Sequence, residues 1–232
     1  MALLTDIRAY YKLDESSGNP VDATGNGYTL TNNNTVGFAS GKINNAADFG
    51  ASNTDKTLSV ASALGIANDA AMSIAYWFKT PATLANFPGV LNYTQNGGIS
   101  LMILLDHTND RIVGISVGPG MNDNTNLGTF TPAVSTWYHF AVTFDGTDAQ
   151  VYKDGSTFGS TYAVDVDAGA SDNFMIGRNV DDFWFADGLI DEVGVWNREL
   201  TSAEITSLYN SGNGLQYPFG ETADTSKMFL MF

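Results

Sequence analysis

The chain has 232 residues, of which 44% are hydrophobic, and no cysteine, so it can bury a sizeable core but can form no disulfide or thiolate metal site. Its 25 acidic and 10 basic residues give a net charge of −15, which would repel phosphate backbones and anionic lipid headgroups. We therefore expect no nucleic-acid partner and no membrane insertion. The 24 glycines and 12% aromatic residues favour strands joined by tight turns.

The sequence shows neither a membrane span nor a signal peptide. The longest strongly apolar run, residues 99–105, is far shorter than the roughly 20 residues of a bilayer-crossing helix. Residues 1–13 lack a long apolar stretch after basic residues. We expect a soluble protein, which, if it acts outside a cell, leaves by another route or as part of a larger particle.

Period-two alternation predicts short strands from the N-terminus onward. Residues 7–13 place Ile7, Ala9, Tyr11 and Leu13 on one face, and polar, turn-rich loops follow at 14–20 and 22–27. Further strands are expected at 28–31, 41–49, 57–60, 72–79, 90–94, 99–105, 111–117, 137–145, 149–153 and 174–177, with a surface loop over 118–129. Roughly a dozen strands at this spacing predict an all-β, antiparallel two-sheet sandwich in one domain.

Residues 188–214 combine the last predicted strand with the single predicted helix. The strand alternates with apolar residues on both faces, except at Asp191 and Glu192, so we expect it to be buried on both sides. Thr201 and Glu204 form the capping-box pattern at the start of a helix of about three turns, which ends near Gly212. A helix this short must dock on the sheet to be stable.

Residues 1–214 are expected to form the domain, and residues 215–232 a C-terminal tail. The tail includes five consecutive apolar residues, 228–232, which would be a liability if exposed to water. Two interpretations stay open: the tail packs on its own domain, or it docks on another protein subunit of an assembly.

An ordered series of motifs runs through most of the chain. The motifs are Tyr11-Lys12-Leu13-Asp14-Glu15-Ser16-Ser17-Gly18, Asp22-Ala23-Thr24-Gly25-Asn26-Gly27, Ala47-Asp48-Phe49, residues 73–79, 137–142, 152–155 and 188–193, and the helix at 200–209. In order and spacing this series resembles the laminin G-like, concanavalin A-like lectin family of jelly-roll domains, in the subgroup found in bacterial and viral surface proteins. The resemblance covers about residues 5–212 and implies two curved sheets of six or seven strands, with loops at one rim often serving as a ligand site. Sugar binding, adhesion and purely structural roles all occur on this fold.

Catalysis is not expected from the residues present. Retaining glucanases of this fold carry two Glu with an intervening Asp on one strand, and the five Glu residues never fall in that pattern. A Ser-His-acid triad needs a histidine beside a nucleophile. Of the two histidines, His107 lies in a predicted turn and His139 in a predicted strand, where a structural role is expected.

Calcium is the expected cofactor, in a structural role. Twenty Asp residues and polar, Gly-containing loops supply the oxygen ligands that this ion prefers, with Asp14, the loop at 22–27 and Asp191 as candidates. In related jelly-roll domains a calcium joins an N-terminal loop to an acidic residue near the last strand, which would map onto Asp22, Asn26 and Asp191. Alternatively, Asp191 accepts hydrogen bonds from the backbone or from Arg198.

Sugar binding needs aromatic faces that stack on C–H surfaces and polar groups that hydrogen-bond hydroxyls. The loop at 178–185 supplies both, and Asn122 would join it if the long loop folds over the concave sheet. Trp77, Trp137 and Trp196 lie in predicted strands and are expected in the core. The candidate ligand-binding residues of the loop are Arg178, Asn179, Asp181, Asp182 and Trp184.

We therefore expect a non-catalytic, lectin-like module for carbohydrate binding or adhesion, on an extracellular or virion surface, with a glycan as ligand. The alternative is a structural or decoration protein of a larger assembly, such as a virion or surface layer, without a sugar ligand.

Overall fold

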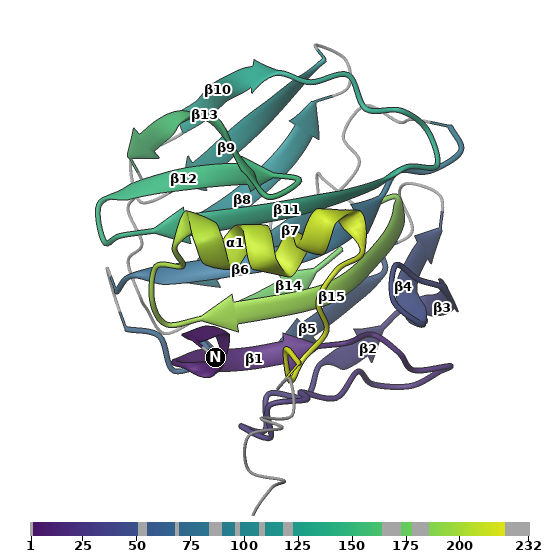
Figure 1. Cartoon of the computed structure of the whole chain (residues 1–232). Coiled ribbons are helices and arrows are strands. Elements are labelled where there is room, and N and C mark those ends of the chain that lie inside the picture. The colour runs from purple at the N-terminus through teal and green to yellow at the C-terminus, as the bar shows by residue number, and fades with distance from the viewer. Residues whose placement is uncertain are drawn as a thin grey trace, which may run out of the picture.

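Two antiparallel sheets stacked on each other, with one helix on the outer face of the first, make up the fold (Figure 1). The predicted all-β, two-sheet antiparallel sandwich with one short C-terminal helix is confirmed. The computed structural model describes residues 2–50, 55–67, 70–83, 90–95, 98–106, 110–117, 123–163, 173–177 and 186–220.

The first sheet has eight strands, in the order β13-β12-β11-β6-β15-β4-β3, with β1 pairing on β15. Strand β15 pairs with three neighbours, because β4 takes its first half and β1 its second half on the side away from β6. The strands of this sheet are β1 (Ile7–Tyr11), β3 (Gly37–Ser40), β4 (Asn45–Gly50), β6 (Met72–Lys79), β11 (Trp137–Phe144), β12 (Asp148–Lys153), β13 (Ser156–Ala163) and β15 (Gly188–Trp196).

The second sheet has seven strands, in the order β10-β9-β8-β7-β14-β5-β2. Strands β7 to β10 form a meander, and β14 enters between β7 and β5. The strands of this sheet are β2 (Thr31–Asn33), β5 (Thr57–Val60), β7 (Val90–Gln95), β8 (Gly98–Asp106), β9 (Arg111–Val117), β10 (Asp123–Thr129) and β14 (Asn173–Ile176).

Several sequence-based boundaries are wrong. The polar stretch predicted as a loop over 118–129 contains β10, an edge strand that pairs on one side only and therefore needs few apolar residues. The strand predicted over 41–49 begins only at Asn45, because residues 41–44 form the tight turn of the hairpin β3–β4, which the Gly41 amide closes by donating to the Asn44 carbonyl at 2.9 Å. The strand predicted at 28–31 begins only at Thr31.

Apolar side chains fill two separate clusters, one on each face of the eight-stranded sheet. The first lies between the sheets and includes Tyr11, Phe49 and Phe140. The second lies between the outer face and the helix, and includes Trp196 and Phe219. Both faces of the first sheet are therefore withdrawn from water, which explains the apolar residues on both sides of β15.

Helix α1 (Ser202–Tyr209) crosses the outer face of this sheet (Figure 1). Its capping box is present as predicted: the Glu204 amide donates to the Thr201 hydroxyl, and the Glu204 carboxylate accepts from the Thr201 amide at 2.9 Å. The helix has 8 residues, fewer than the three turns predicted, because Asn210 adopts a left-handed conformation that ends it. A 3₁₀ turn, η3 (Asn210–Gly212), follows. None of the helices in the described residues is long and apolar enough to cross a bilayer.

Replacing the capping hydroxyl tests how far the helix depends on its first turn. We expect Thr201→Ala to lower the free energy of unfolding by about 1 kcal/mol, because the Glu204 amide loses the side-chain acceptor of the N-cap. Urea denaturation measures the change. The neighbouring exposed Ser202→Ala is the control and should have little effect; equal losses for both variants would contradict the capping role.

Candidate functional site

The predicted sugar-binding residues Arg178, Asn179, Asp181, Asp182 and Trp184, and also Asn122, lie outside the described residues. The structure does describe the two ends of the loop that carries the first five. The Ala186 amide donates to the Gly177 carbonyl at 2.7 Å, at the point where the chain leaves β14 in one sheet and enters β15 in the other. The residues on either side of the loop, Gly177 and Ala186, are therefore held together by a hydrogen bond at the point where the chain passes from one sheet to the other. We call this hydrogen-bonded pair the base of the loop.

Gly177 is required at this base for steric reasons. Its φ is +98°, a conformation that favours glycine, and a Cβ there would lie 2.1 Å from the Phe49 ring. Phe49 is wholly buried in the core between the sheets. The packing of the core therefore fixes where the 178–185 loop begins.

Strand pairing identifies the other strand ends that lie at the same end of the sandwich as Gly177. We call this end of the sandwich the loop rim. The end of β14 pairs with the starts of β7 and β5, and the start of β15 pairs with the ends of β4 and β6. The end of β6 in turn pairs with the start of β11 at Trp137. The loop rim thus comprises the strand ends at Gly50, Leu58, Lys79, Leu91, Trp137, Ile176 and Gly188, together with Gly177 just after β14.

The same register places the start of β10, just after Asn122, at the opposite end of the strands from the loop rim. Asp123 pairs with Ser116 of β9, and successive pairings through β8 and β7 bring this level to the first residue of β14, Asn173. Strands β9, β8 and β7 lie between β10 and β14. The four strand-to-strand spacings place the axes of β10 and β14 roughly 19 Å apart. The backbone beside Asn122 is therefore distant from the loop rim, and a shared site with Trp184 stays a prediction.

The predicted calcium residues Asp22 and Asn26 lie in a loop that is hydrogen-bonded to itself and to β1. Asp22 accepts from the backbone amides of Tyr10 at 3.2 Å, Thr24 at 3.0 Å and Tyr28 at 3.3 Å, and from the Thr24 hydroxyl at 2.7 Å. Asn26 donates its side-chain amide to a backbone carbonyl of β1 at 2.9 Å. The donors of the chain itself therefore occupy both oxygens of Asp22.

Asp191, the third predicted calcium residue, is paired with another part of the backbone. Its carboxylate accepts from the amides of Lys42 at 2.8 Å, Ile43 at 3.0 Å and Glu192 at 2.9 Å, which fixes the β3–β4 turn against β15. In the part of the chain that the structure describes, no three Asp, Glu or His side chains form a group that could hold a metal ion. Asp22, Asn26 and Asp191 therefore do not fit one shared calcium ion.

These contacts give a direct expectation for metal removal. Because backbone donors satisfy Asp22 and Asp191, excess chelator should leave the melting temperature unchanged. Differential scanning calorimetry with chelator, with added calcium and with added magnesium measures this. A melting temperature that rises with calcium alone would instead show an ion bound to the native state.

A β-bulge in β15 creates a second buried acidic group beside Asp191. The pairing with β6 shifts register between Asp191 and Gly194, and Glu192 adopts a φ of +52°. The bulge turns the Glu192 carboxylate toward the Tyr10 hydroxyl and the Gln216 amide, each at 2.5 Å. Glu192 thereby connects β1, β15 and the segment that follows the helix.

Burial dominates the titration of both carboxyls. It raises the pKa of Asp191 to about 8 and the pKa of Glu192 to about 7, although the hydrogen bonds that each accepts act in the opposite direction. Burial, together with the Glu192 charge, also raises the pKa of Tyr10 well above its usual value. As the pH rises, Asp191 and Glu192 therefore lose their protons at a lower pH in the unfolded chain than in the folded chain.

This difference predicts a pH dependence of stability. A carboxyl whose pKa is raised by folding favours the folded state at low pH, and that contribution is lost as the pH rises from about 4.5 toward 7. Glu192→Gln keeps an acceptor for Gln216 and can donate to Tyr10, but does not titrate. We expect its loss of stability between pH 5 and pH 8 to be smaller than that of the wild type by on the order of 2 kcal/mol.

Urea denaturation at the two pH values measures the effect, with the exposed Glu199→Gln as the matched control. An identical pH dependence for Glu192→Gln and the wild type would contradict the assignment.

His139 and Glu204, two side chains that could serve in acid–base chemistry, are held by contacts within the fold. His139 is buried beside Trp77 and Tyr209, and burial lowers its pKa to about 4, so the ring is neutral at physiological pH. Hydrogen bonds from Arg198 are the main cause that lowers the pKa of Glu204 to about 2. His107 lies outside the described residues.

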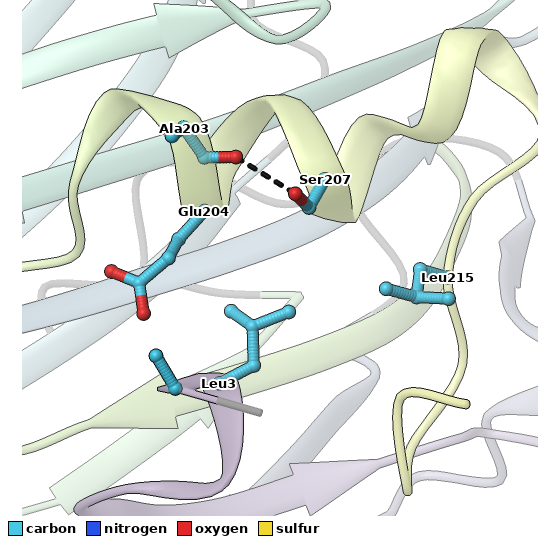
Figure 2. A pocket seen from close by; sticks show the side chains of 6 residues that line it. Leu3, Ala203, Glu204, Ser207 and Leu215 are labelled. Atoms are coloured by element: carbon cyan, nitrogen blue, oxygen red, sulfur yellow. Dashed lines mark hydrogen bonds between the residues drawn. The ribbon is translucent and has the colours of Figure 1, made fainter. Parts of the chain in front are cut away.

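A pocket of about 300 Å³ lies between α1, the N-terminal 3₁₀ turn η1 (Ala2–Leu4) and the segment after the helix (Figure 2). Leu3 lies beneath the helix and Leu215 to one side of it. Sequence reasoning missed this pocket because three segments far apart along the chain form it. Its lining residues are Ala2, Leu3, Ala203, Glu204, Ser207 and Leu215.

Solved structures with the same fold include binding domains and an enzyme. Domain 4 of AbnA, a GH43 extracellular arabinanase from Geobacillus stearothermophilus in complex with arabinotriose, is 23% identical at a TM-score of 0.62, over 87% of this chain and 97% of that one. A Trypanosoma rangeli sialidase is 15% identical at a TM-score of 0.65, over 89% of this chain but only 33% of that one.

The binding domain of botulinum neurotoxin DC, solved with rat synaptotagmin II, is 14% identical at a TM-score of 0.64, over 90% of this chain and 52% of that one. At these identities the likeness establishes the fold. No curated protein matches the chain by sequence.

A family model described as the concanavalin A-like lectin/glucanases superfamily matches residues 51–206. This match covers more than half of the chain and includes the pairing of β6, β11 and β15 at the centre of the eight-stranded sheet. The chain therefore belongs to the concanavalin A-like lectin/glucanase superfamily.

Proposed function

We propose that the chain is a non-catalytic, lectin-like carbohydrate-binding module that takes a glycan at the loop rim. The observation that carries this proposal is the match with the arabinanase domain, which spans 97% of a domain solved in complex with arabinotriose. The match is of domain to domain, whereas only a third of the sialidase chain is covered.

The chemistry of the 178–185 loop supports the same assignment. A sugar presents C–H faces that stack on an aromatic ring such as Trp184, while its hydroxyls hydrogen-bond to carboxylates and amides such as Asp181 and Asn179. The loop leaves a base fixed by the contact of Gly177 with Phe49, and a fixed base lowers the entropy cost of ordering a binding loop.

A non-catalytic role is supported by the carboxylates that the structure describes. Glu192 is buried and hydrogen-bonded to Tyr10 and Gln216, and Glu204 is paired with Arg198 and the helix N-terminus. Glycoside hydrolysis by a pair of acids requires two carboxyls that flank the bound substrate, and these two carboxylates are instead engaged with other parts of the chain.

Removing the aromatic face tests the proposal. We expect the wild type to bind members of a glycan array that includes arabino-oligosaccharides, and Trp184→Ala to bind the same glycans at least about tenfold more weakly, which corresponds to about 1.4 kcal/mol. Isothermal titration calorimetry measures the loss. The control Val21→Ala truncates a side chain that is 59% exposed and should bind normally.

A wild type that binds no glycan, with or without calcium, would refute the lectin function. Equal affinities for wild type and Trp184→Ala would refute the assigned loop.

A structural or decoration role in a larger assembly on a virion or cell surface is the second candidate. The five consecutive apolar residues of the tail favour it, and a neighbour of the same fold was solved in complex with a protein, rat synaptotagmin II. Static light scattering decides between a monomer and an oligomer: a full chain that stays monomeric at all concentrations counts against self-assembly.

A further inference from the structure

The pocket beneath α1 is mostly apolar and has no partner among the described residues. Leu3, Leu215 and Ala203 supply apolar surface. The two polar side chains that line it are engaged with the chain: Ser207 donates to the Ala203 carbonyl at 2.8 Å, and Glu204 pairs with Arg198 at 2.6 Å. The pocket therefore offers an apolar guest no unpaired charge.

The pocket volume is suited to large apolar side chains. A cavity of about 150 Å³ lined by apolar residues accommodates benzene. The pocket, at about 300 Å³, has room for roughly two groups of that size. Residues 228–232 of the tail consist of two phenylalanines, two methionines and one leucine, with no charge among them.

The last described residues of the chain lie near the pocket. Leu215 lines the pocket, and Phe219 packs on the Trp196 ring at 6.1 Å between centroids. The Trp196 indole in turn donates to the carbonyl of Leu3 at 2.8 Å. Residues 221–227 then connect Gly220 to the apolar segment, and seven residues reach up to about 24 Å when extended.

We propose that residues 228–232 of the same chain dock in the pocket formed by α1, η1 and Leu215. The segment inserts one or two of its large side chains between Leu3 and Ala203 and removes apolar surface of both partners from water. This inference does not depend on glycan binding, because the pocket contains none of the residues assigned to the loop rim.

Disulfide trapping tests the proposal, because the chain has no cysteine of its own. The double variant Ser207→Cys, Leu230→Cys is oxidised at low micromolar concentration and run on a non-reducing gel. We expect an intrachain disulfide, seen as a faster-migrating monomer without free thiols. The matched control Ser202→Cys, Leu230→Cys places the first thiol on the same helix but away from the pocket, and should stay reduced.

A disulfide-linked dimer would overturn the proposal and assign the pocket to the tail of a second copy. No disulfide, or equal trapping in the control, would overturn it as well.

Stability provides a second readout. Deleting residues 228–232 should lower the melting temperature by about 5 °C, the shift expected when one large side chain loses its burial. In Ala203→Trp, where a side chain of the helix fills the pocket, the same deletion should have little effect. An unchanged melting temperature in the wild-type background, or an equal decrease in both backgrounds, would refute the docking.

Discussion

The interaction on which the rest of the structure depends is the bulge of β15 at Asp191 and Glu192. Strand β15 is the most shared strand of the eight-stranded sheet, since β1, β4 and β6 all pair with it. The bulge places two adjacent carboxyls on different partners: Asp191 holds the β3–β4 turn, and Glu192 holds Tyr10 and Gln216. One irregularity thus joins the N-terminal strand, a hairpin and the segment after the helix.

Much of this architecture could be predicted from the sequence. The long alternating strands, the capping box and the two-sided burial of β15 follow from local pattern, since each depends on residues close together along the chain. The bulge did not follow, because a period-two count of side chains assumes regular pairing along the whole strand. Strand β10 was missed because an edge strand can be polar.

For the candidate sites too, local sequence pattern was informative and arrangement in space was not predictable. A pattern of residue types can nominate the 178–185 loop for sugar chemistry, and topology then gives the loop its base between Gly177 and Ala186. The pattern of residue types could not show which residues lie close together in the folded chain. Asp22 and Asp191 share a residue type and a family precedent, yet each is bonded to a different stretch of backbone. The pocket beneath α1 has no sequence signature, since its walls come from three separate segments.

The covering of the outer sheet face has a consequence for how the chain folds during synthesis. This face presents Tyr10, Trp77 and Trp196, which are buried by α1 and by residues up to Phe219. The ribosome makes those covering residues after every strand of both sheets. A nascent chain with its sandwich already paired would therefore still expose an aromatic surface, the kind of surface that chaperones recognise and that drives aggregation at high concentration. The final short helix and the turns behind it end that exposure.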